Sequence, residues 1–187
     1  MYGVVNRSLK ELVITHHGEE RWQRVLALSN VPGDSFLSMQ SYDDQVTYDL
    51  AQAVAQELAM PVDDALRAFG VHWVEHTMAH HYDALARAAG SNLLQFLENL
   101  NTLHDRISST FLEYRPPRFD IRHLSSQRVE VLYSSERIGL TPFVEGLLEG
   151  LSKRFNEPID IENIELLPSP LGTQSRFEVR LIEAIDG

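Results

Sequence analysis

The sequence predicts an α+β fold, in which a helical first part is followed by a sheet that one helix interrupts. Apolar residues recur at helical spacing as far as Phe111, and the pair Pro116-Pro117 then stops helical structure. Beyond this pair, short runs alternate between apolar and polar residues, as half-buried strands do. The 187 residues are enough for one domain whose core could enclose a cofactor.

Five helices are expected before the proline pair, and several have clear boundary signals. Gly18 is well placed to end the first helix, and Pro61 to begin the fourth. Asp43 or Asp44 could cap the third. The expected helices cover residues 4–18, 19–28, 44–60, 61–81 and 92–111.

The second part of the chain predicts four strands and one helix. Between the second and third strands, Phe143, Leu147 and Leu151 mark the apolar face of a helix. The expected strands cover residues 119–122, 128–133, 159–166 and 176–182.

Composition excludes several functional classes. The chain has no cysteine, which excludes disulfides, thiolate metal sites and a cysteine-ligated heme. The formal net charge of −11 argues against a nucleic-acid partner, because such proteins display basic patches. We find neither an apolar run long enough to span a bilayer nor a secretory signal, so a cytoplasmic protein without a membrane partner is expected.

Four residues have side chains suited to holding a heme. His104 follows Leu100 and Leu103 on a run of helical spacing, which places its imidazole beside the buried stripe, where a neutral nitrogen could bind iron. Tyr133, Ser135 and Arg137 alternate along an extended run, so all three side chains would leave one face of a strand. One guanidinium and two hydroxyls can hold a pair of carboxylates, such as the propionates of heme. Taken singly, each residue has an ordinary structural interpretation.

The joint pattern resembles the heme–nitric oxide/oxygen binding (H-NOX) family, which includes the sensor domain of soluble guanylate cyclase. The family's proximal histidine is matched by His104, and its porphyrin-packing proline by Pro117. Its Tyr-x-Ser-x-Arg motif is matched by residues 133–137. The opening segment Met1–Asn6 also looks like the family's amino terminus, and the resemblance covers essentially the whole chain.

The resemblance implies a single domain over residues 1–187 that holds one non-covalent heme b. The heme would lie between an N-terminal helical lobe, residues 1–62, and a C-terminal lobe, residues 63–187, that contains an antiparallel sheet. His104 would be the axial ligand of the iron, and Pro117 would press on the porphyrin. Tyr133, Ser135 and Arg137 would clamp the propionates.

The implied function is gas sensing without catalysis. The domain would bind nitric oxide and carbon monoxide at a ferrous heme and signal to an effector, such as a histidine kinase, a cyclic-dinucleotide enzyme or a guanylate cyclase. A heme carrier or gas store without output would use the same residues, and it stays an alternative.

The distal pocket bears on which gas binds. Oxygen-binding family members supply a distal tyrosine nine residues after the motif tyrosine, and here Pro142 occupies that position without a donor group. We therefore expect nitric oxide and carbon monoxide to bind in preference to oxygen. The indole N–H of Trp73 could donate if it faces the iron. The expected lining comprises Val5, Trp73, Leu140, Pro142, Phe143 and Leu147, with Leu9, Phe69 and Val144.

A zinc hydrolase is the rival interpretation. His72, Glu75 and His76 match the H-x-x-E-H arrangement, in which two histidines grip zinc and a glutamate serves as base. A downstream glutamate, Glu145 or Glu149, would have to be the third ligand, although no motif supports it. The pair His16-His17 is interpreted as a helix C-terminus favoured by the dipole, not as a ligand pair.

Overall fold

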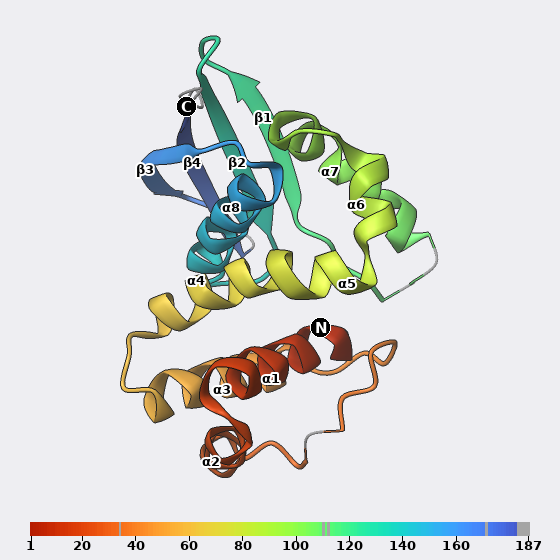
Figure 1. Cartoon of the computed structure of the whole chain (residues 1–187), viewed down its shortest axis with the longest axis vertical. Coiled ribbons are helices and arrows are strands. Elements are labelled where there is room, and N and C mark those ends of the chain that lie inside the picture. Colours follow the sequence, from red (N-terminus) through yellow and green to blue (C-terminus); the bar gives the residue numbers. More distant parts are fainter. Residues whose placement is uncertain (34, 110, 112, 171, 183–187) are drawn as a thin grey trace.

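A computed structural model describes residues 1–33, 35–109, 111, 113–170 and 172–182. It confirms the α+β class: helices and a four-stranded antiparallel sheet form two parts, and one long helix runs between them (Figure 1). The helices are α1 (Gly3–His17), α2 (Glu19–Ser29), α3 (Asp44–Glu57), α4 (Val62–His72), η1 (Trp73–Met78), α5 (Ala79–His81), α6 (Asp83–Ala89), α7 (Leu93–Ser108) and α8 (Thr141–Phe155). The strands are β1 (Arg118–His123), β2 (Arg128–Ser135), β3 (Ile159–Leu167) and β4 (Thr173–Leu181).

The helix expected over residues 61–81 contains a feature that the apolar spacing did not show. Its middle segment, η1, is a π-helix, so α4, η1 and α5 form one continuous rod with a widened turn. The short α6 that follows was missed, because its alanines carry little periodic contrast. The helix with His104 ends at Ser108 and not at Phe111, and residue 110 lies outside the described part of the chain.

Local chemistry explains several boundaries. Asp43 caps α3 by accepting a 2.8 Å hydrogen bond from the backbone N–H of Gln45. Asn92 caps α7 in the same way through the N–H of Gln95, also at 2.8 Å. These caps satisfy backbone donors that the first turn of a helix cannot pair internally.

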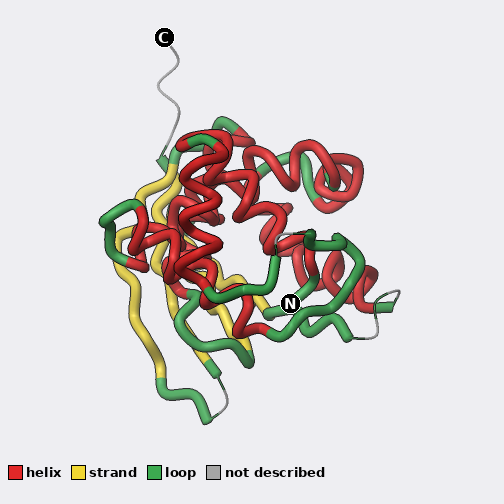
Figure 2. Tube along the Cα trace, turned by 90° about the horizontal axis from the view of Figure 1, so that it is seen from below, coloured by secondary structure: helices red, strands yellow, loops and turns green. Residues whose placement is uncertain are grey.

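The sheet has the strand order β1-β2-β4-β3, and every neighbouring pair is antiparallel. The strands lie together on one side of the molecule, and helices cover one face of them (Figure 2). Along β2 the buried residues are Val129, Val131 and Tyr133, so this face of the strand points into the core. The strand alternation expected from the sequence is therefore confirmed.

Two apolar clusters fill the two parts, and the long helix contributes to both. Ala65, Leu66 and Phe69 on α4 pack with α1–α3, whereas Val74 and Met78 on η1 pack with the sheet, α7 and α8. Trp73, between these two sets, contacts both clusters. The division into lobes at residue 62 stays a prediction.

Glycines at their contact allow helices α8 and α4 to pack closely together. A Cβ on Gly146 would lie 2.0 Å from the carbonyl oxygen of Arg67, and one on Gly70 would lie 2.1 Å from that of Phe143. Only glycine permits this approach of the two backbones. The contact fixes Phe143 against Phe69 on α4, with ring centroids 4.9 Å apart.

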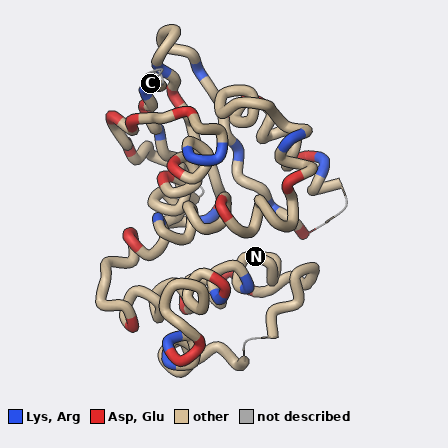
Figure 3. The backbone as a smooth tube through the Cα atoms, viewed as in Figure 1, with Lys and Arg blue, Asp and Glu red and all other residues tan. Residues whose placement is uncertain are grey.

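Acidic and basic residues occur along the backbone in both parts of the molecule and are intermixed (Figure 3). Within the described ranges, no helix combines the length and apolar character needed to cross a membrane.

Candidate functional site

His104 lies on α7 with one ring nitrogen already bound. Its Nδ1–H donates to the backbone carbonyl oxygen of Pro117 at 3.2 Å, whereas Nε2 makes no hydrogen bond to any described residue. Burial lowers the pKa of His104, although this hydrogen bond acts in the opposite direction. The imidazole is therefore neutral near pH 7, with its lone pair on Nε2, which is the form that binds a metal.

Asn101, one turn before His104, fixes the helix to the sheet. Its side chain donates to the carbonyl oxygen of Phe119 at 2.7 Å and accepts from the N–H of Phe119 at 2.9 Å. This pair of bonds joins α7 to the start of β1, immediately after Pro117. The sequence reasoning missed Asn101, for which the only signal was an amide beside an otherwise apolar helical stripe.

The three residues of the Tyr-x-Ser-x-Arg motif do not all lie on a strand. Tyr133 is 2% exposed on β2, and Ser135 ends that strand. Arg137 follows in a turn, where its backbone N–H donates to the Ser135 hydroxyl at 3.1 Å. The expected strand alternation therefore holds for Tyr133 and Ser135 and is wrong for Arg137, which a turn carries instead.

Arg137 is bound to a carboxylate from the other part of the molecule. Its Nε donates to Asp44 at 2.8 Å, its Nη2 to the same carboxylate at 3.4 Å, and its Nη1 to the carbonyl oxygen of Arg115 at 2.8 Å. A guanidinium carries five N–H groups, so two remain for another acceptor. Burial acts to raise the pKa of Asp44, but the bonds from the Met1 amine and Arg137 outweigh it, and the pKa is lowered. Sequence reasoning named Asp44 only as a possible helix cap and missed it as a partner of Arg137, from which it is 93 residues distant in the chain.

A pocket of about 510 Å³ opens beside Arg137, between the two parts of the molecule. Its walls come from the first residue, the loop before α3 and α3 itself, and from the segments before β1 and after β2. The lining residues are Met1, Ser41, Tyr42, Asp44, Tyr48, Glu113, Arg115, Glu136, Arg137 and Ile138. A group held here would contact charged and phenolic side chains.

Tyr114 lies between His104 and the N-terminal segment. Its ring centroid is 6.2 Å from that of His104 and 6.2 Å from that of Tyr2. Burial raises the pKa of Tyr114 to about 12, so this phenol stays protonated at physiological pH. The aromatic contacts connect the first residues of the chain with the histidine.

The residues expected to line a distal pocket fall on facing elements. Phe69 brings Trp73 and Phe143 together, with centroid distances of 6.4 and 4.9 Å. Pro142 occupies the first turn of α8. Of the others, Val5 and Leu140 pack on the N-terminal cluster and Leu147 on the C-terminal cluster. The indole N–H of Trp73 has no hydrogen-bond partner among the residues that the structure describes.

The histidine group that the structure brings together is not the predicted hydrolase site. His72 and His76 lie with His16 of α1, and one nitrogen from each ring falls within 4.8 Å of the others. Glu75 instead pairs with Lys153 of α8 at 2.9 Å, away from this group. The H-x-x-E-H arrangement is therefore wrong for Glu75. His16 lies in the last turn of α1, as expected, and its ring also approaches His72 and His76, which the sequence reasoning did not foresee.

Neither glutamate named as a third zinc ligand belongs to that group. Glu145 and Glu149 both form ion pairs with Arg67, the former at 3.4 Å. His80 also stays outside, since its Nδ1 bonds the carbonyl oxygen of His76 at 2.7 Å. A hydrolase centre is thus not assembled from the predicted residues.

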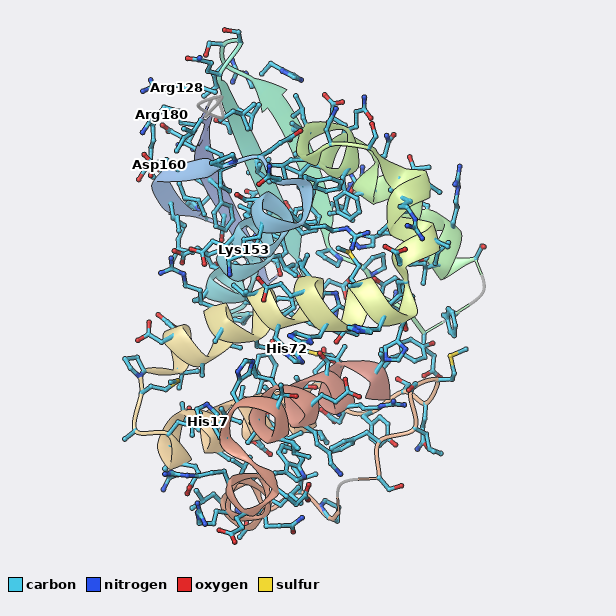
Figure 4. All side chains as sticks on the ribbon, viewed as in Figure 1. His17, His72, Arg128, Lys153, Asp160 and Arg180 are labelled. Atoms are coloured by element: carbon cyan, nitrogen blue, oxygen red, sulfur yellow. The ribbon has the colours of Figure 1, made fainter. Side chains whose placement is uncertain are left out.

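His72 is buried without any hydrogen bond. It is 2% exposed, both ring nitrogens lack a partner, and its side chain points from α4 toward α1 (Figure 4). Desolvation lowers the pKa of His72 to about 4, assisted by the nearby imidazoles of His76 and His16. A buried polar atom left unpaired costs roughly 1–3 kcal/mol.

The family model described as haem-NO-binding matches residues 2–163. Among curated relatives, soluble guanylate cyclase gcy-31 of Caenorhabditis elegans is 25% identical over 167 residues, which are 89% of this chain and 24% of that protein. Guanylate cyclase soluble subunit beta-2 of Rattus norvegicus is 31% identical over 90 residues, 48% of this chain and 13% of that one. The chain thus spans about a quarter or less of these relatives.

Solved structures share the fold over the full length. An H-NOX protein from S. oneidensis in the Fe(II) state, a triple mutant, has a TM-score of 0.85 at 22% identity, covering 100% of this chain and 98% of that one. The Fe(II) unliganded H-NOX protein from K. algicida has a TM-score of 0.82 at 18% identity, with 99% and 98% covered. These likenesses agree with the α+β arrangement of two parts.

Proposed function

The chain belongs to the haem-NO-binding (H-NOX) family, and we propose that it is a heme-based sensor domain for nitric oxide and carbon monoxide. The family's cofactor is heme, and its domain is a sensor rather than a catalyst. Bound ferrous heme supplies the iron at which a diatomic gas binds. The residues of this chain must hold that group, orient it and respond to it.

The orientation of His104 is the observation that carries the proposal. Its Nδ1–H is fixed by the Pro117 carbonyl, and Nε2 is left without a partner in the described chain. A ligating histidine needs this arrangement, because the hydrogen bond at one nitrogen sets the tautomer that offers the other. In the proposal His104 is the axial ligand, and the adjoining Pro117 packs on the porphyrin.

The donor set at the lobe junction fits the carboxylates of a heme b. Arg137 lines the pocket and keeps two N–H groups free, and the hydroxyls of Tyr133 and Ser135 lie on the strand that leads to it. Charge-assisted hydrogen bonds of this kind are about twice as strong as neutral ones. These three residues would clamp the propionates, with Asp44 keeping the guanidinium in place.

Gas selectivity is proposed from the distal residues. Pro142 offers no donor, and the rings of Phe69 and Phe143 provide an apolar wall. Oxygen requires a donor more than nitric oxide or carbon monoxide does, so the latter two are the proposed ligands. Val5, Leu140 and Leu147 complete the proposed lining.

Signalling would pass from His104 to the rest of α7. Asn101 holds this helix to β1, so a change in how His104 is held by the group it binds would alter the restraint on the C-terminal end of α7, while the Asn101 bonds keep the helix on the sheet. The relatives that the chain matches are guanylate cyclases of about four times its length, which makes such an enzyme the first effector to test. A histidine kinase or a cyclic-dinucleotide enzyme is the other proposed class.

The test replaces the axial side chain and restores it chemically. His104→Gly should abolish the visible heme spectrum of the purified chain, and added imidazole should recover it. The matched control is His123→Gly, which removes an exposed imidazole paired with Glu98 at 2.8 Å. Unchanged spectra in His104→Gly would reject His104 as the ligand.

A further inference from the structure

We propose that His16, His72 and His76 form a binding site for a divalent transition-metal ion of the zinc class, which links α1 to the α4–η1 helix. The site is separate from the proposed heme site, because none of its three histidines is among the residues proposed to ligate, clamp or line the heme. Its metal would be a structural tie between helices of the two apolar clusters.

The geometry is close to that of a three-imidazole site. One nitrogen from each ring lies within 4.8 Å of the other two. Zinc binds histidine nitrogen at about 2.0–2.1 Å in a tetrahedron, which brings ligand atoms to roughly 3.3 Å from one another. Side-chain rotations of His16, which is exposed, and of His76 would close the remaining gap.

The two helices present the rings in a suitable way. His72 and His76 are four residues apart, and their rings stack with centroids 4.4 Å apart and an interplanar angle of 19°. The ring of His16 meets both nearly edge-on, at 6.1 Å from His72 and 6.4 Å from His76. Two ligands from one helix and a third from another make a ligation that spans an interface.

The second observation is the lack of any partner for His72. Both of its nitrogens are buried and make no hydrogen bond to any described residue, although the ring points toward α1 (Figure 4) and lies 6.1 Å from the ring of His16. Buried polar side chains nearly always have a partner, so an unpartnered one calls for an explanation. A metal ion would accept the lone pair of one of these nitrogens.

The donor chemistry selects the metal class. Three neutral imidazoles without a thiolate suit zinc, copper, nickel and iron, and exclude calcium and magnesium, which prefer oxygen. Three protein ligands leave a fourth position for water.

Titration of Zn²⁺ into the heme-loaded chain, after treatment with a chelator, tests the site. Calorimetry should show one ion per chain for the wild type. His16→Gln and His76→Gln should each weaken binding by roughly tenfold or more, since loss of even an outer-shell partner of a metal ligand costs that much. The matched controls are His17→Gln and His80→Gln, neighbours that lie outside the group, and they should bind Zn²⁺ as the wild type does.

Amide hydrogen exchange tests whether the bound metal links α1 to the α4–η1 helix. Zn²⁺ should slow exchange at the end of α1 and in η1 in the wild type, and it should have no such effect in His76→Gln. The proposed site would be rejected if the wild type and His16→Gln bound Zn²⁺ with equal affinity. It would also be rejected if the control variants lost as much Zn²⁺ affinity as His16→Gln and His76→Gln. Saturable binding without any change in exchange would overturn the link between the helices.

Discussion

The surroundings of His104 and of His72 differ in how the ring nitrogens are occupied. His104 has Nδ1 bound to the Pro117 carbonyl, on a helix that Asn101 fixes to β1. His72 is more deeply buried, yet neither of its nitrogens has a partner. Burial alone thus leaves an imidazole without a defined tautomer, whereas one backbone acceptor defines it. The hydrogen bond at Nδ1 leaves Nε2 of His104 available to bind one ligand, whereas both ring nitrogens of His72 still need a binding partner.

The largest effect on the free energy of unfolding is expected at Asn101, which joins the helix of His104 to β1. Asn101→Ala removes two hydrogen bonds and leaves the N–H and carbonyl of Phe119 unpaired, which should lower the free energy of unfolding by roughly 2–4 kcal/mol. Urea unfolding of the heme-loaded chain measures it. Asn99 lies on the same helix as Asn101 and donates one hydrogen bond, to the carbonyl oxygen of Ala89 on α6. Asn99→Ala should therefore cost only about 1 kcal/mol. Equal losses of unfolding free energy in the two variants would show that the pair of bonds from Asn101 contributes no more than the single bond from Asn99.

An effect of opposite sign is expected in the second region. His72→Leu replaces two unpaired buried nitrogens by apolar atoms, so the chelator-treated protein should gain roughly 1–2 kcal/mol in the free energy of unfolding. Thr77→Val is the contrast, because the Thr77 hydroxyl bonds Ser8 at 2.5 Å and the change leaves Ser8 unpaired. That variant should lose about 1–2 kcal/mol. Destabilisation by His72→Leu would show that its nitrogens do have partners.

A smaller, pH-dependent effect is expected at the pocket that Arg137 lines. The pKa of Asp44 is below its ordinary value of 3.8, so its stabilising effect is present above that pH and is lost as the pH falls through the lowered pKa. The unfolding midpoint of the wild type should exceed that of Asp44→Asn at neutral pH and approach it in acid. Asp49→Asn, on the same helix and outside every ion pair of the described residues, is the control. A gap that persists in strong acid would contradict the assignment to this carboxylate.

The smallest structural effect is expected at Trp73, whose indole N–H makes no hydrogen bond to any described residue. Trp73→Phe should lower the unfolding midpoint only modestly, because the smaller ring keeps part of the contact with both clusters and no hydrogen bond to a described residue is lost. The informative measurement is the ferrous spectrum in air, which should show no stable oxygen binding in the wild type or the variant. Oxygen binding that disappears in Trp73→Phe would identify the indole as a donor and overturn the proposed selectivity.

Much of the fold could be predicted because its signals are local. Gly18, Pro61 and the proline pair mark boundaries through backbone chemistry, and the alternation along β2 shows its buried face. The π-segment η1 escaped prediction because one widened turn hardly alters the apolar spacing. Helix α6 escaped because a run of alanines has no distinct face.

The candidate site likewise contains residues that the sequence predicts and partners that it does not. His104 and the motif from Tyr133 to Arg137 are recognisable from spacing alone. The partners of these residues are not, since Asp44 lies 93 residues from Arg137 and meets it only through the fold. His16 likewise reaches His72 from another helix. Long-range polar pairing leaves no periodic trace in one sequence.

The π-helical turn has a consequence for how this chain compares with its relatives. A π-turn holds one residue more than an α-turn between bonded partners, so it amounts to a single-residue insertion that the helix absorbed. Deleting one residue from Trp73–Met78 should therefore restore a regular α-helix and leave the helical segments on either side in the same orientation. Chains without the wide turn should therefore be one residue shorter here, and an alignment that ignores this would misassign the pocket residues on one side of it.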